Sequence, residues 1–516
     1  MNRTKIAPLY IFFTLIMLLG ILARVWEFGE LPPGLHQDEA SSGVDAFSLY
    51  SFGSDRNGVS FPVHFISWGS GQNVLYAYVL IPLIALGDLT PGTVRLPMLV
   101  SGILTLPLVY FVARRTVDEK FGLLAMFLIA ISPWHIMLSR WGLESNLLPF
   151  VFLLGYACLL KSTANNNWFI AANMFFALCL YTYGTAYVAV PTFLACAVPI
   201  LLWSKRVSVR KLIIGLITLA VVGLPIGLFL LVNTLQLSSL HLGFFTIPSL
   251  PSQPRYEIEA FRANPFLALG QNLLYMFYLL ARQTDGLPWN TLEPYGYFYR
   301  FTLPLAFIGV VQLLRARGSA NMPERLLLLS WLVASLTIGI LQPVNINRIN
   351  LIFIPLIICM ALPFVWLGER RRSALVLALC VLLISFAAFT RDYHSDRYRE
   401  QANQVFYPGL LPAVEFARQA GDIHNPICVT GSVNMPYIFV LFTEQMNPTD
   451  YLTDIDYLDP HAPFRQVRAL GRYTFGLENC LRDDRTIYVL NEEERPPYLD
   501  INYTVSSFGN YNVYVP

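Results

Sequence analysis

The sequence predicts a mainly α-helical integral membrane protein of about eleven transmembrane helices, with a small α/β domain at its C-terminal end. Three observations predict this. Of the 516 residues, 55% are hydrophobic and only 13% are charged, which is roughly half the charged fraction of a soluble domain. Apolar runs long enough to cross a bilayer recur along the first 390 residues. After Thr390 the charged residues become dense and the apolar runs become short.

A helix that crosses the hydrocarbon layer needs about 20 mostly apolar residues. The predicted spans are 7–26, 94–113, 120–138, 146–160, 167–183, 185–203, 211–232, 300–315, 325–342, 349–367 and 373–390. The first run is too long for a typical signal-peptide core and no A-x-A site follows it, so we expect an uncleaved helix.

Orientation follows from the Lys and Arg residues of the short loops. If all basic clusters are cytoplasmic, the predicted spans alternate correctly, provided that two other apolar stretches do not cross. We expect a re-entrant or interfacial helix at 72–88 and an amphipathic surface helix at 265–282. The N-terminus is then cytoplasmic, and the long loops are external. The short basic loops and the lack of a eukaryotic retention signal favour a prokaryotic plasma membrane.

The chain therefore divides into a transmembrane domain, 1–390, with a first external loop at 27–93, and an extracytoplasmic α/β domain, 391–516. In the second domain, 410–420 is predicted to be a helix, and 426–431, 486–490 and 511–515 are predicted strands. Cys428 and Cys480 are its only cysteines. An oxidising compartment would allow a disulfide between them; two buried thiols are the alternative.

Carboxylates stand out in the first external loop. Pro32, Pro33 and Gly34 end the first helix, and a short helix is predicted over 38–51. Adjacent helix residues point about 100° apart, so Asp38 and Glu39 cannot both face one cavity, whereas Asp45 shares the face of Asp38. Asp38 is either a helix N-cap or a catalytic carboxylate, and the two roles can coexist.

Several short motifs occur in a fixed order along residues 1–390. They are Pro32-Pro33-Gly34 followed by Asp38-Glu39-Ala40, Arg95-Leu96-Pro97, Ser132-Pro133-Trp134-His135 followed by Ser139-Arg140 and Glu144, Tyr181-x-Tyr183-Gly184-Thr185, and Asn347-Arg348-Ile349-Asn350. In order, spacing and topology the chain resembles the GT-C superfamily of membrane glycosyltransferases. It is similar to the branch that holds the protein O-mannosyltransferases and the lipid A aminoarabinose transferase (glycosyltransferase family 39-like).

The resemblance implies inverting transfer of a monosaccharide from a polyprenyl-phosphate donor to an acceptor hydroxyl on the external face, with 1–390 as the catalytic domain. One carboxylate must take the proton of the acceptor hydroxyl, and the phosphate departs without protonation. The resemblance assigns this base to Asp38, with Glu39 as a supporting carboxylate and Glu144 as a second acidic residue lining the cavity. A solvated loop charge, or a partner of Arg140, is the alternative for Glu144.

The departing phosphate needs positive charge, which a guanidinium supplies in suitable geometry. We expect Arg348 in this role, with Asn347 beside it; a lipid-headgroup anchor is the alternative. Asp45, Arg282 and Tyr183 complete the expected substrate-binding set, and Arg24 and Arg300 are further candidates. The chain departs from the aminoarabinose transferase branch at Gly71-Gln72-Asn73, where that branch has a phosphate-binding lysine. Aromatic residues in 289–299 could stack on a sugar or form an interfacial belt.

No cofactor is expected. His36 and His64 flank the first loop helix without metal-ligand spacing, which indicates surface residues, although a divalent metal held with the carboxylates is an alternative. The expected partners are a polyprenyl-phosphate sugar, membrane lipid, and a lipid, polysaccharide or protein acceptor. The net charge of +2 gives no indication of nucleic acid.

Two other functions remain open. A transporter or flippase of lipid-linked sugars would carry internal repeats and charges at mid-membrane, and the sequence shows neither. A non-catalytic subunit for envelope assembly would not need Asp38 and would use its C-terminal domain for the interaction. In the enzyme, that domain is expected to select the acceptor.

Overall fold

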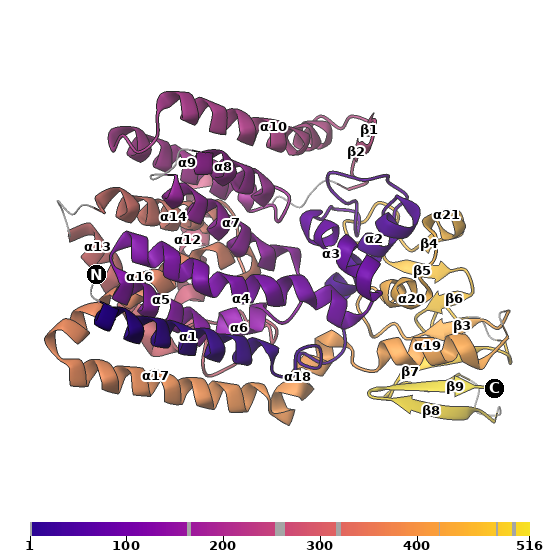
Figure 1. The fold of residues 1–516 in the computed structure, drawn as a ribbon. Helices are drawn as coiled ribbons and strands as arrows, with labels where there is room; N and C mark the ends of the chain where they lie inside the picture. Colours follow the sequence, from indigo (N-terminus) through magenta and orange to yellow (C-terminus); the bar gives the residue numbers. More distant parts are fainter. Residues whose placement is uncertain are drawn as a thin grey trace. The chain divides into compact units, whose positions relative to one another are not determined.

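The computed structural model describes residues 3–162, 167–252, 264–315, 321–422, 424–480, 483–497 and 502–516, and it is mainly helical (Figure 1). The chain forms two compact units. We call the first the helical unit; it consists of Met1–Phe28, Met98–Leu224 and Tyr256–Tyr398. We call the second the mixed unit; it consists of Gly29–Pro97, Pro225–Arg255 and Arg399–Pro516.

The helical unit contains the expected apolar helices. In chain order these are α1 (Arg3–Val25), α4 (Pro91–Thr116), α5 (Glu119–Ala130), α6 (Pro133–Leu138), α7 (Glu144–Lys161), α8 (Asn167–Cys179), α9 (Ala186–Trp203), α10 (Val209–Thr234), α12 (Pro265–Arg282), η1 (Arg300–Thr302), α13 (Leu303–Arg315), α14 (Met322–Leu341), α15 (Ile346–Ile349), η2 (Asn350–Ile352), α16 (Phe353–Arg370) and α17 (Arg372–Tyr393). Helices α4 and α10 continue into the mixed unit.

Seven helical segments within the described residues are long and apolar enough to cross a membrane. They are Pro91–Thr116, Glu144–Lys161, Ala186–Trp203, Val209–Thr234, Met322–Leu341, Ile346–Arg370 and Arg372–Tyr393. The remaining predicted spans also fall on helices, but these helices are shorter or less apolar. The expectation of a membrane protein with a helical bundle is therefore confirmed.

The prediction of one continuous span over 120–138 is wrong. Helix α5 ends at Ala130 and α6 begins at Pro133. Proline lacks the N–H of a helix interior and forces the residue before it into extended backbone; Ser132 accordingly has φ −65° and ψ 122°. The Ser132 hydroxyl and the Trp134 N–H then both donate to the carbonyl oxygen of Tyr297, at 2.9 Å and 3.2 Å.

The two stretches predicted not to cross are both helical. Helix α3 (Leu75–Gly87) has 13 residues, about 20 Å of length, which is too short for a hydrocarbon layer of about 30 Å. Helix α12 buries one face, including Ala268, Asn272 and Met276. Its other face exposes apolar side chains, among them Phe266 and Phe277. This exposed face is therefore apolar, whereas the exposed face of a helix in water is polar.

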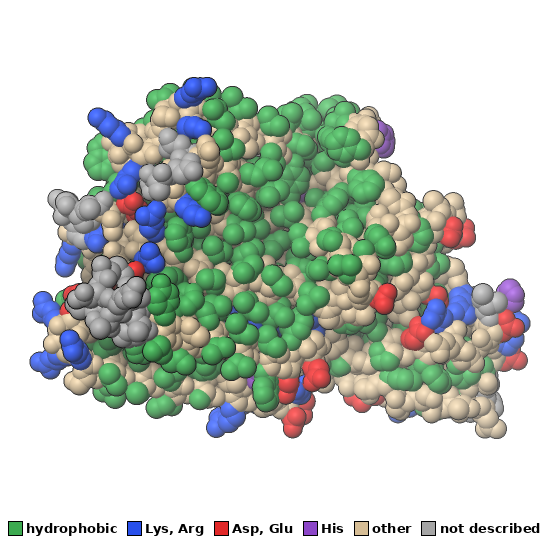
Figure 2. Space-filling model, in the orientation of Figure 1, with side chains coloured by type: hydrophobic (Ala, Val, Ile, Leu, Met, Phe, Trp, Pro, Cys, Tyr) green, Lys and Arg blue, Asp and Glu red, His purple; other side chains and the backbone are tan. Residues whose placement is uncertain are grey.

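Basic loops meet at one end of the helical unit. Arg206, after α9, lies 3.3 Å from Glu324 of α14, and the Asn321 amide donates to the carbonyl oxygen of Val117 between α4 and α5. Figure 2 shows Lys and Arg gathered at this end, on the left, beside helix flanks that are covered by hydrophobic side chains. This grouping agrees with the orientation scheme, whereas the side of the membrane that it faces stays a prediction.

The mixed unit contains a seven-stranded sheet with strand order β4-β5-β6-β3-β7-β9-β8. Its strands are β3 (Ile427–Val429), β4 (Asp456–Tyr457), β5 (Val467–Leu470), β6 (Tyr473–Phe475), β7 (Ile487–Asn491), β8 (Thr504–Phe508) and β9 (Tyr511–Val515). β3 is parallel to β6 and β7, and the other pairs are antiparallel. The three strands predicted in this region are confirmed as β3, β7 and β9.

Further elements complete the mixed unit. They are α2 (Gln37–Phe52), α3, a hairpin of β1 (Leu240–Leu242) and β2 (Phe245–Ile247), α19 (Leu410–Ala420), α20 (Tyr437–Glu444) and α21 (Pro448–Tyr451), and α18 (Asp396–Phe406) leads into it from the helical unit. Helix α19 matches the predicted 410–420. It packs against β3, β7, β8 and β9, and α20 contacts both α19 and α2. The small α/β domain is thus observed, while the functional boundary at residue 391 stays a prediction.

Cys428 of β3 and Cys480 form a disulfide with a Cα–Cα distance of 5.7 Å. Cys428 belongs to a buried cluster with Tyr488, Leu490 and Tyr514, against which Cys480 packs. The disulfide that the sequence allowed is therefore observed, and the alternative of two buried thiols is excluded.

Replacing Cys480 with Ser should destabilise the sheet. The bond closes a loop with a sequence separation of 52, and chain entropy gives about 4 kcal/mol for a loop of this size. We expect a lower midpoint of thermal unfolding for the detergent-purified variant. An exposed free cysteine, Cys380→Ser, is the control. An unchanged midpoint would show that the bond adds no stability.

Candidate functional site

Helix α2 begins at a capping box that sets the direction of Asp38. His36 is the N-cap: its Nδ1 accepts the Asp38 N–H at 3.2 Å, and its own N–H donates to Glu39 Oε2 at 3.0 Å. The interpretation of Asp38 as the N-cap is therefore wrong. His36 is buried, and burial lowers the pKa of its imidazole. A neutral ring keeps the lone pair that this cap requires.

Glu39 is committed to a buried ion pair with Arg95. Arg95 Nε lies 2.8 Å from Glu39 Oε1 and Arg95 Nη2 lies 2.9 Å from Oε2, a bidentate pair with both side chains fully buried. The same guanidinium donates to the carbonyl oxygens of Gly29, Pro32 and Gly34 at 3.2, 2.8 and 2.8 Å. Arg95, at the start of α4, therefore connects the proline turn to Glu39 on α2.

Asp45 is committed in the same way, to Arg56. Its Oδ2 lies 2.6 Å from Arg56 Nη1, and its Oδ1 accepts the Arg56 backbone N–H at 3.1 Å. Arg56 also donates to the hydroxyls of Ser41 and Ser67 and lies over the ring of Trp68, 4.6 Å from its centroid. Because Asp45 is completely buried, we assign it a structural role rather than the expected contact with substrate.

Asp38 differs from both of these carboxylates. Its side chain is 28% exposed, and its Oδ2 lies 3.6 Å from Nδ1 of His36. Of the three carboxylates on α2, Asp38 is the one that reaches solvent. Glu39 and Asp45 are each paired with a buried arginine. The helix start thus presents a single accessible carboxylate in a fixed direction.

The C-terminal segment builds part of the surroundings of Asp38. The Leu35 N–H donates to the carbonyl oxygen of Phe406 at 2.5 Å. Gly34 has φ +70°, and a Cβ there would collide with the same carbonyl oxygen. Burial raises the pKa of the Tyr407 hydroxyl, and the negative charge of Asp38 raises it further. Residues 406–407 therefore lie against the turn that carries the candidate base.

Asp55 is a buried acid that the sequence reasoning did not single out. Its Oδ1 accepts the N–H groups of Asn57 and Val59, both at 2.9 Å. Its Oδ2 has no hydrogen-bond partner among the described residues. Burial, and then the charge of Asp45, raise the pKa of Asp55 to about 7.

In the helical unit, Glu144 is the first residue of α7 and is half-buried. Arg140, which precedes it, is completely buried and donates to the carbonyl oxygens of Arg24 and Glu27 at 3.1 and 2.8 Å. It also lies over the ring of Tyr393, 5.6 Å from its centroid. Arg140 therefore binds the C-terminal end of α1, and Glu144 begins α7.

Amide side chains from three segments join at the first turn of α7. The Asn290 amide donates to Asn347 Oδ1 at 2.7 Å, and the Asn347 amide donates to Asn146 Oδ1 at 3.3 Å. Asn290 also donates to Asp285 at 2.8 Å, and the Asn350 amide donates to the carbonyl oxygen of Ser145 at 2.8 Å. Asn347 was expected in a site; its amide partners were not. The only sequence signal was the spacing of asparagines in 345–350.

The expected cationic residues differ in their surroundings. Arg348 is half-buried, and its Nη1 donates to the carbonyl oxygen of Pro343 at 3.0 Å. Arg282 is exposed at the end of α12 and bonds to the Tyr278 hydroxyl. Arg24 is buried and donates to three carbonyl oxygens and to His135, so it is excluded as a phosphate ligand.

Tyr183 lies half-buried in the turn between α8 and α9. It belongs to the helical unit, as do Glu144, Asn347, Arg348 and Arg282, whereas Asp38, Glu39 and Asp45 belong to the mixed unit. Within the helical unit, Asn347 is the expected residue that the structure joins to the first turn of α7.

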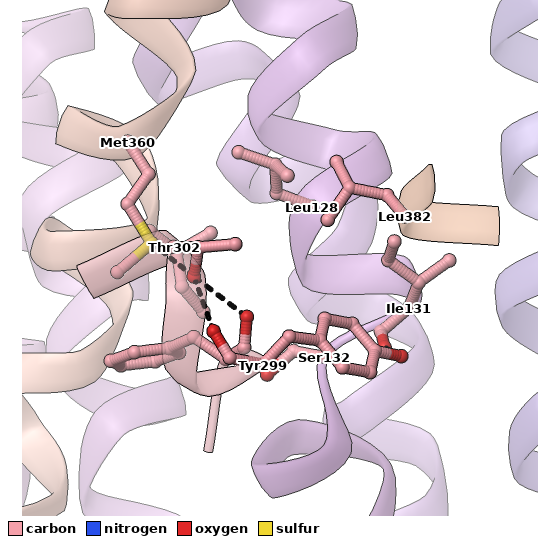
Figure 3. A pocket seen from close by; sticks show the side chains of 9 residues that line it. Leu128, Ile131, Ser132, Tyr299, Thr302, Met360 and Leu382 are labelled. Atoms are coloured by element: carbon pink, nitrogen blue, oxygen red, sulfur yellow. Dashed lines mark hydrogen bonds between the residues drawn. The ribbon is translucent and has the colours of Figure 1, made fainter. Parts of the chain in front are cut away.

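A small pocket in the helical unit does not suit a sugar. It is enclosed by side chains of α5, η1, α16 and α17 and the segments next to them, including Leu128, Met360 and Leu382 (Figure 3). Its volume is about 10 Å³, the space of a single water molecule. The Thr302 hydroxyl at its wall is already bonded to the carbonyl oxygens of Phe298 and Tyr299.

The expectation that His36 and His64 lie on the surface is wrong, since both are buried. His64 stacks on Phe229 with ring centroids 4.1 Å apart, and its Nδ1 lies 3.0 Å from the carbonyl oxygen of Phe65. Within the described ranges, no three His, Cys, Asp or Glu side chains are grouped to hold a metal ion.

Comparison with known proteins gives a family match over part of the chain, and a fold. Residues 72–237 match the sequence model of a family described as dolichyl-phosphate-mannose-protein mannosyltransferase. No curated protein matches at a significant level. The structure is similar to ArnT from Cupriavidus metallidurans, with a TM-score of 0.58 and 12% identity over 99% of this chain and 98% of ArnT. The same enzyme bound to undecaprenyl phosphate gives a TM-score of 0.56 at 12% identity, with the same shares of both chains covered.

The oligosaccharyltransferase of Archaeoglobus fulgidus is also similar, with a TM-score of 0.53 and 14% identity over 87% of this chain. The chain spans 65% of that enzyme's length. At these identities the likeness shows the fold. The resemblance seen in the sequence motifs is thereby confirmed for the architecture.

Changing Glu39 to Gln should destabilise the protein by about 3–5 kcal/mol, because it leaves the buried Arg95 charge unpaired. Asp38→Asn removes a partly exposed charge and should change stability by less than about 0.5 kcal/mol. Thermal unfolding of both variants in detergent measures the difference. Equal midpoints would contradict a structural role for Glu39.

Asp55→Asn should alter the pH dependence of stability. The folded protein holds the Asp55 proton more tightly than the unfolded chain, so this contribution is complete below pH 4 and is lost as pH rises to about 7. The loss is at most about 4 kcal/mol. The unfolding midpoint of the variant minus that of the wild type should therefore be larger at pH 8 than at pH 5. A gap that is the same at both pH values would show that Asp55 does not titrate in this range.

Proposed function

Because the chain has the fold of the GT-C membrane glycosyltransferases, we propose that it transfers one monosaccharide from a polyprenyl-phosphate donor to an acceptor hydroxyl. The match of residues 72–237 to a mannosyltransferase family supports this proposal. So does the similarity over 98% of ArnT, which has been crystallised with undecaprenyl phosphate. The acceptor would be a lipid, a polysaccharide or a protein.

Accessibility of Asp38 is the observation that carries the mechanism. In the proposed reaction the acceptor hydroxyl oxygen attacks the anomeric carbon while Asp38 takes its proton. The bond from that carbon to the phosphate oxygen breaks on the opposite side, so the configuration inverts. Glu39 and Asp45 cannot compete as bases, since arginines hold both of their carboxylates in buried pairs.

Fixed placement supports this role. The capping box at His36 and the hydrogen bond from Leu35 to Phe406 hold the turn on both sides of Asp38. Restricting a reacting group to one direction lowers the entropic part of a barrier. Glu39 is thus proposed as a positioning residue rather than a second catalytic carboxylate.

In this proposal Arg348 is the cation that meets the leaving phosphate, and Glu144 is a second acidic residue near the donor. The reaction would occur on the external face of a prokaryotic plasma membrane, next to the C-terminal domain. That domain would help to select the acceptor. Because Phe406 also supports the turn at Asp38, point variants rather than deletion would be needed to test its role in selection.

Asp38→Asn should lower the transfer rate by at least about 10²-fold, because the amide cannot take a proton. Purified protein in nanodiscs would be given undecaprenyl-phosphate sugars and membrane extract, with radiolabelled product as the readout. Binding of the donor should be retained. Glu30→Gln, a change of an exposed carboxylate at the start of the same loop, should transfer like the wild type.

Other outcomes would redirect the proposal. Undiminished transfer by Asp38→Asn would keep the enzyme class and move the base to Glu144. Absence of transfer by the wild type from every donor tried, with binding intact, would favour the flippase.

A further inference from the structure

The hairpin of β1 and β2 takes no part in the proposed reaction. Its strands pair antiparallel, with Leu242 opposite Phe245. Only Gly243 and Phe244 connect the strands, and Gly243 has φ +65°, the conformation that a two-residue hairpin turn needs at its first position. Phe244 therefore lies at the tip of the hairpin, and its side chain is 83% exposed.

The exposed apolar surface continues from the tip toward α10. Leu240 and Leu242 of β1 are exposed, and so are Leu235 and Leu237, which precede the hairpin. Soluble proteins rarely expose a large group of apolar side chains, and such a group usually marks a contact with another protein or with a membrane. The hairpin is therefore expected to have a partner outside its own fold.

The absence of charge favours a membrane over a protein as this partner. The stretch from Leu212 to Pro254, which includes the hairpin and most of α10, has no Lys, Arg, Asp or Glu. A soluble segment as long as 235–252 would carry about four charged residues. Recognition between proteins commonly uses complementary charges, which this stretch lacks, whereas a contact with lipid chains needs none.

The hairpin is fixed to the end of α10, a helix long and apolar enough to cross a membrane. The Asn233 amide, in the last turn of α10, donates to the carbonyl oxygen of Pro248 at 3.0 Å, and its Oδ1 accepts the Leu250 N–H at 2.8 Å. Figure 1 shows the hairpin beside this helix end. Since α10 has 26 residues, it is about 39 Å long and exceeds a hydrocarbon layer of about 30 Å. Its end, with the hairpin, would therefore lie at the headgroup layer.

The hairpin also binds the first external loop. The Val63 N–H donates to the carbonyl oxygen of Thr246 at 2.9 Å, and the Thr246 N–H donates to that of Phe61 at 3.3 Å. Further along this loop, Gln72 Oε1 accepts the hydroxyl of Ser41 on α2 at 3.2 Å. A hairpin inserted in lipid would therefore hold this loop, and α2 with it, at the membrane surface.

We propose that the β1–β2 hairpin is an interfacial anchor, whose tip at Phe244 inserts into the adjacent lipid leaflet and keeps the first external loop at a fixed depth. Apolar surfaces of peripheral segments bury about 5–10 Å into the boundary between headgroups and acyl chains, a depth that a short hairpin can reach. The inference goes beyond the proposed function and does not rest on it, because its test needs no sugar transfer.

A nitroxide label at Phe244→Cys tests the lipid contact. The full chain would be placed in nanodiscs of phosphatidylethanolamine and phosphatidylglycerol. Molecular oxygen concentrates in lipid, whereas nickel ethylenediaminediacetate stays in water, so their collision rates with the label report its surroundings. The ratio of the oxygen rate to the nickel rate should be several-fold higher than for a label in water. The variant would carry Cys380→Ser to remove an exposed free cysteine, and the signal of labelled Cys380→Ser alone would be subtracted.

Ser507→Cys in the same background is the matched control. Ser507 is also an exposed residue of a strand in an antiparallel hairpin of the mixed unit, the hairpin of β8 and β9. It lies outside the uncharged stretch, and its label should collide more often with the nickel complex.

Each other outcome would overturn the proposal. Equal ratios for the labels at Phe244→Cys and Ser507→Cys would place the hairpin in water. Low collision rates with both reagents at Phe244→Cys would show that protein covers the tip, either a second copy of the chain or another partner. None of these results depends on whether the chain transfers a sugar.

Phe244→Asp tests the effect on the first external loop. The label is then placed at Ser60→Cys, an exposed position next to Phe61. A charged tip is expelled from lipid, so the collision rate of this label with the nickel complex should rise several-fold. Ser507→Asp, the control, should not change it, and both variants should keep the wild-type unfolding midpoint because both side chains are exposed. An unchanged rate in Phe244→Asp would show that the hairpin does not hold the loop at the membrane.

Discussion

The buried pair of Glu39 and Arg95 is the interaction on which the accessible face of α2 depends. Its guanidinium has its donors spread over one carboxylate and three carbonyl oxygens, so one side chain fixes the proline turn, the helix start and the beginning of α4. Without the arginine, the Glu39 charge would be buried alone at a cost of several kcal/mol. With it, the negative charge of Glu39, the residue next to Asp38, is neutralised.

A second arginine, Arg56, pairs in the same way with Asp45, which lies about two turns further along α2. Arg56 neutralises Asp45 and binds the surrounding hydroxyls, and its backbone carbonyl oxygen accepts the Tyr451 hydroxyl at 2.7 Å. The helix therefore carries three acidic residues but shows one charge to the outside.

Local patterns gave much of the architecture. Apolar length placed the helices, α19 matched its predicted range, and three strands were found from β-branched and aromatic runs. The predicted span over 120–138 missed the break at Ser132, because it was drawn from apolar length alone. The effect of Pro133 on the backbone was not taken into account. The sheet was underestimated, since β4, β5, β6 and β8 are short or polar and become strands by pairing.

The candidate site was predictable only in part. Asp38 and Asn347 came from motif positions, but the roles of Glu39 and Asp45 depend on arginines that pair with them in space. Arg95 lies far along the chain from Glu39, and no local periodicity links the two. The amide side chains that meet at the first turn of α7 likewise come from three distant segments, so composition alone could not bring them together.

The contact of Leu35 with Phe406 has a consequence for biogenesis. The turn that carries Asp38 leaves the ribosome early, while the carbonyl oxygen that completes it belongs to a residue made after the last helix of the bundle. Synthesis of the intervening chain at about 5–20 residues per second takes tens of seconds. Nascent chains in the membrane thus lack a finished turn at Asp38, and a chain truncated before Phe406 never acquires one.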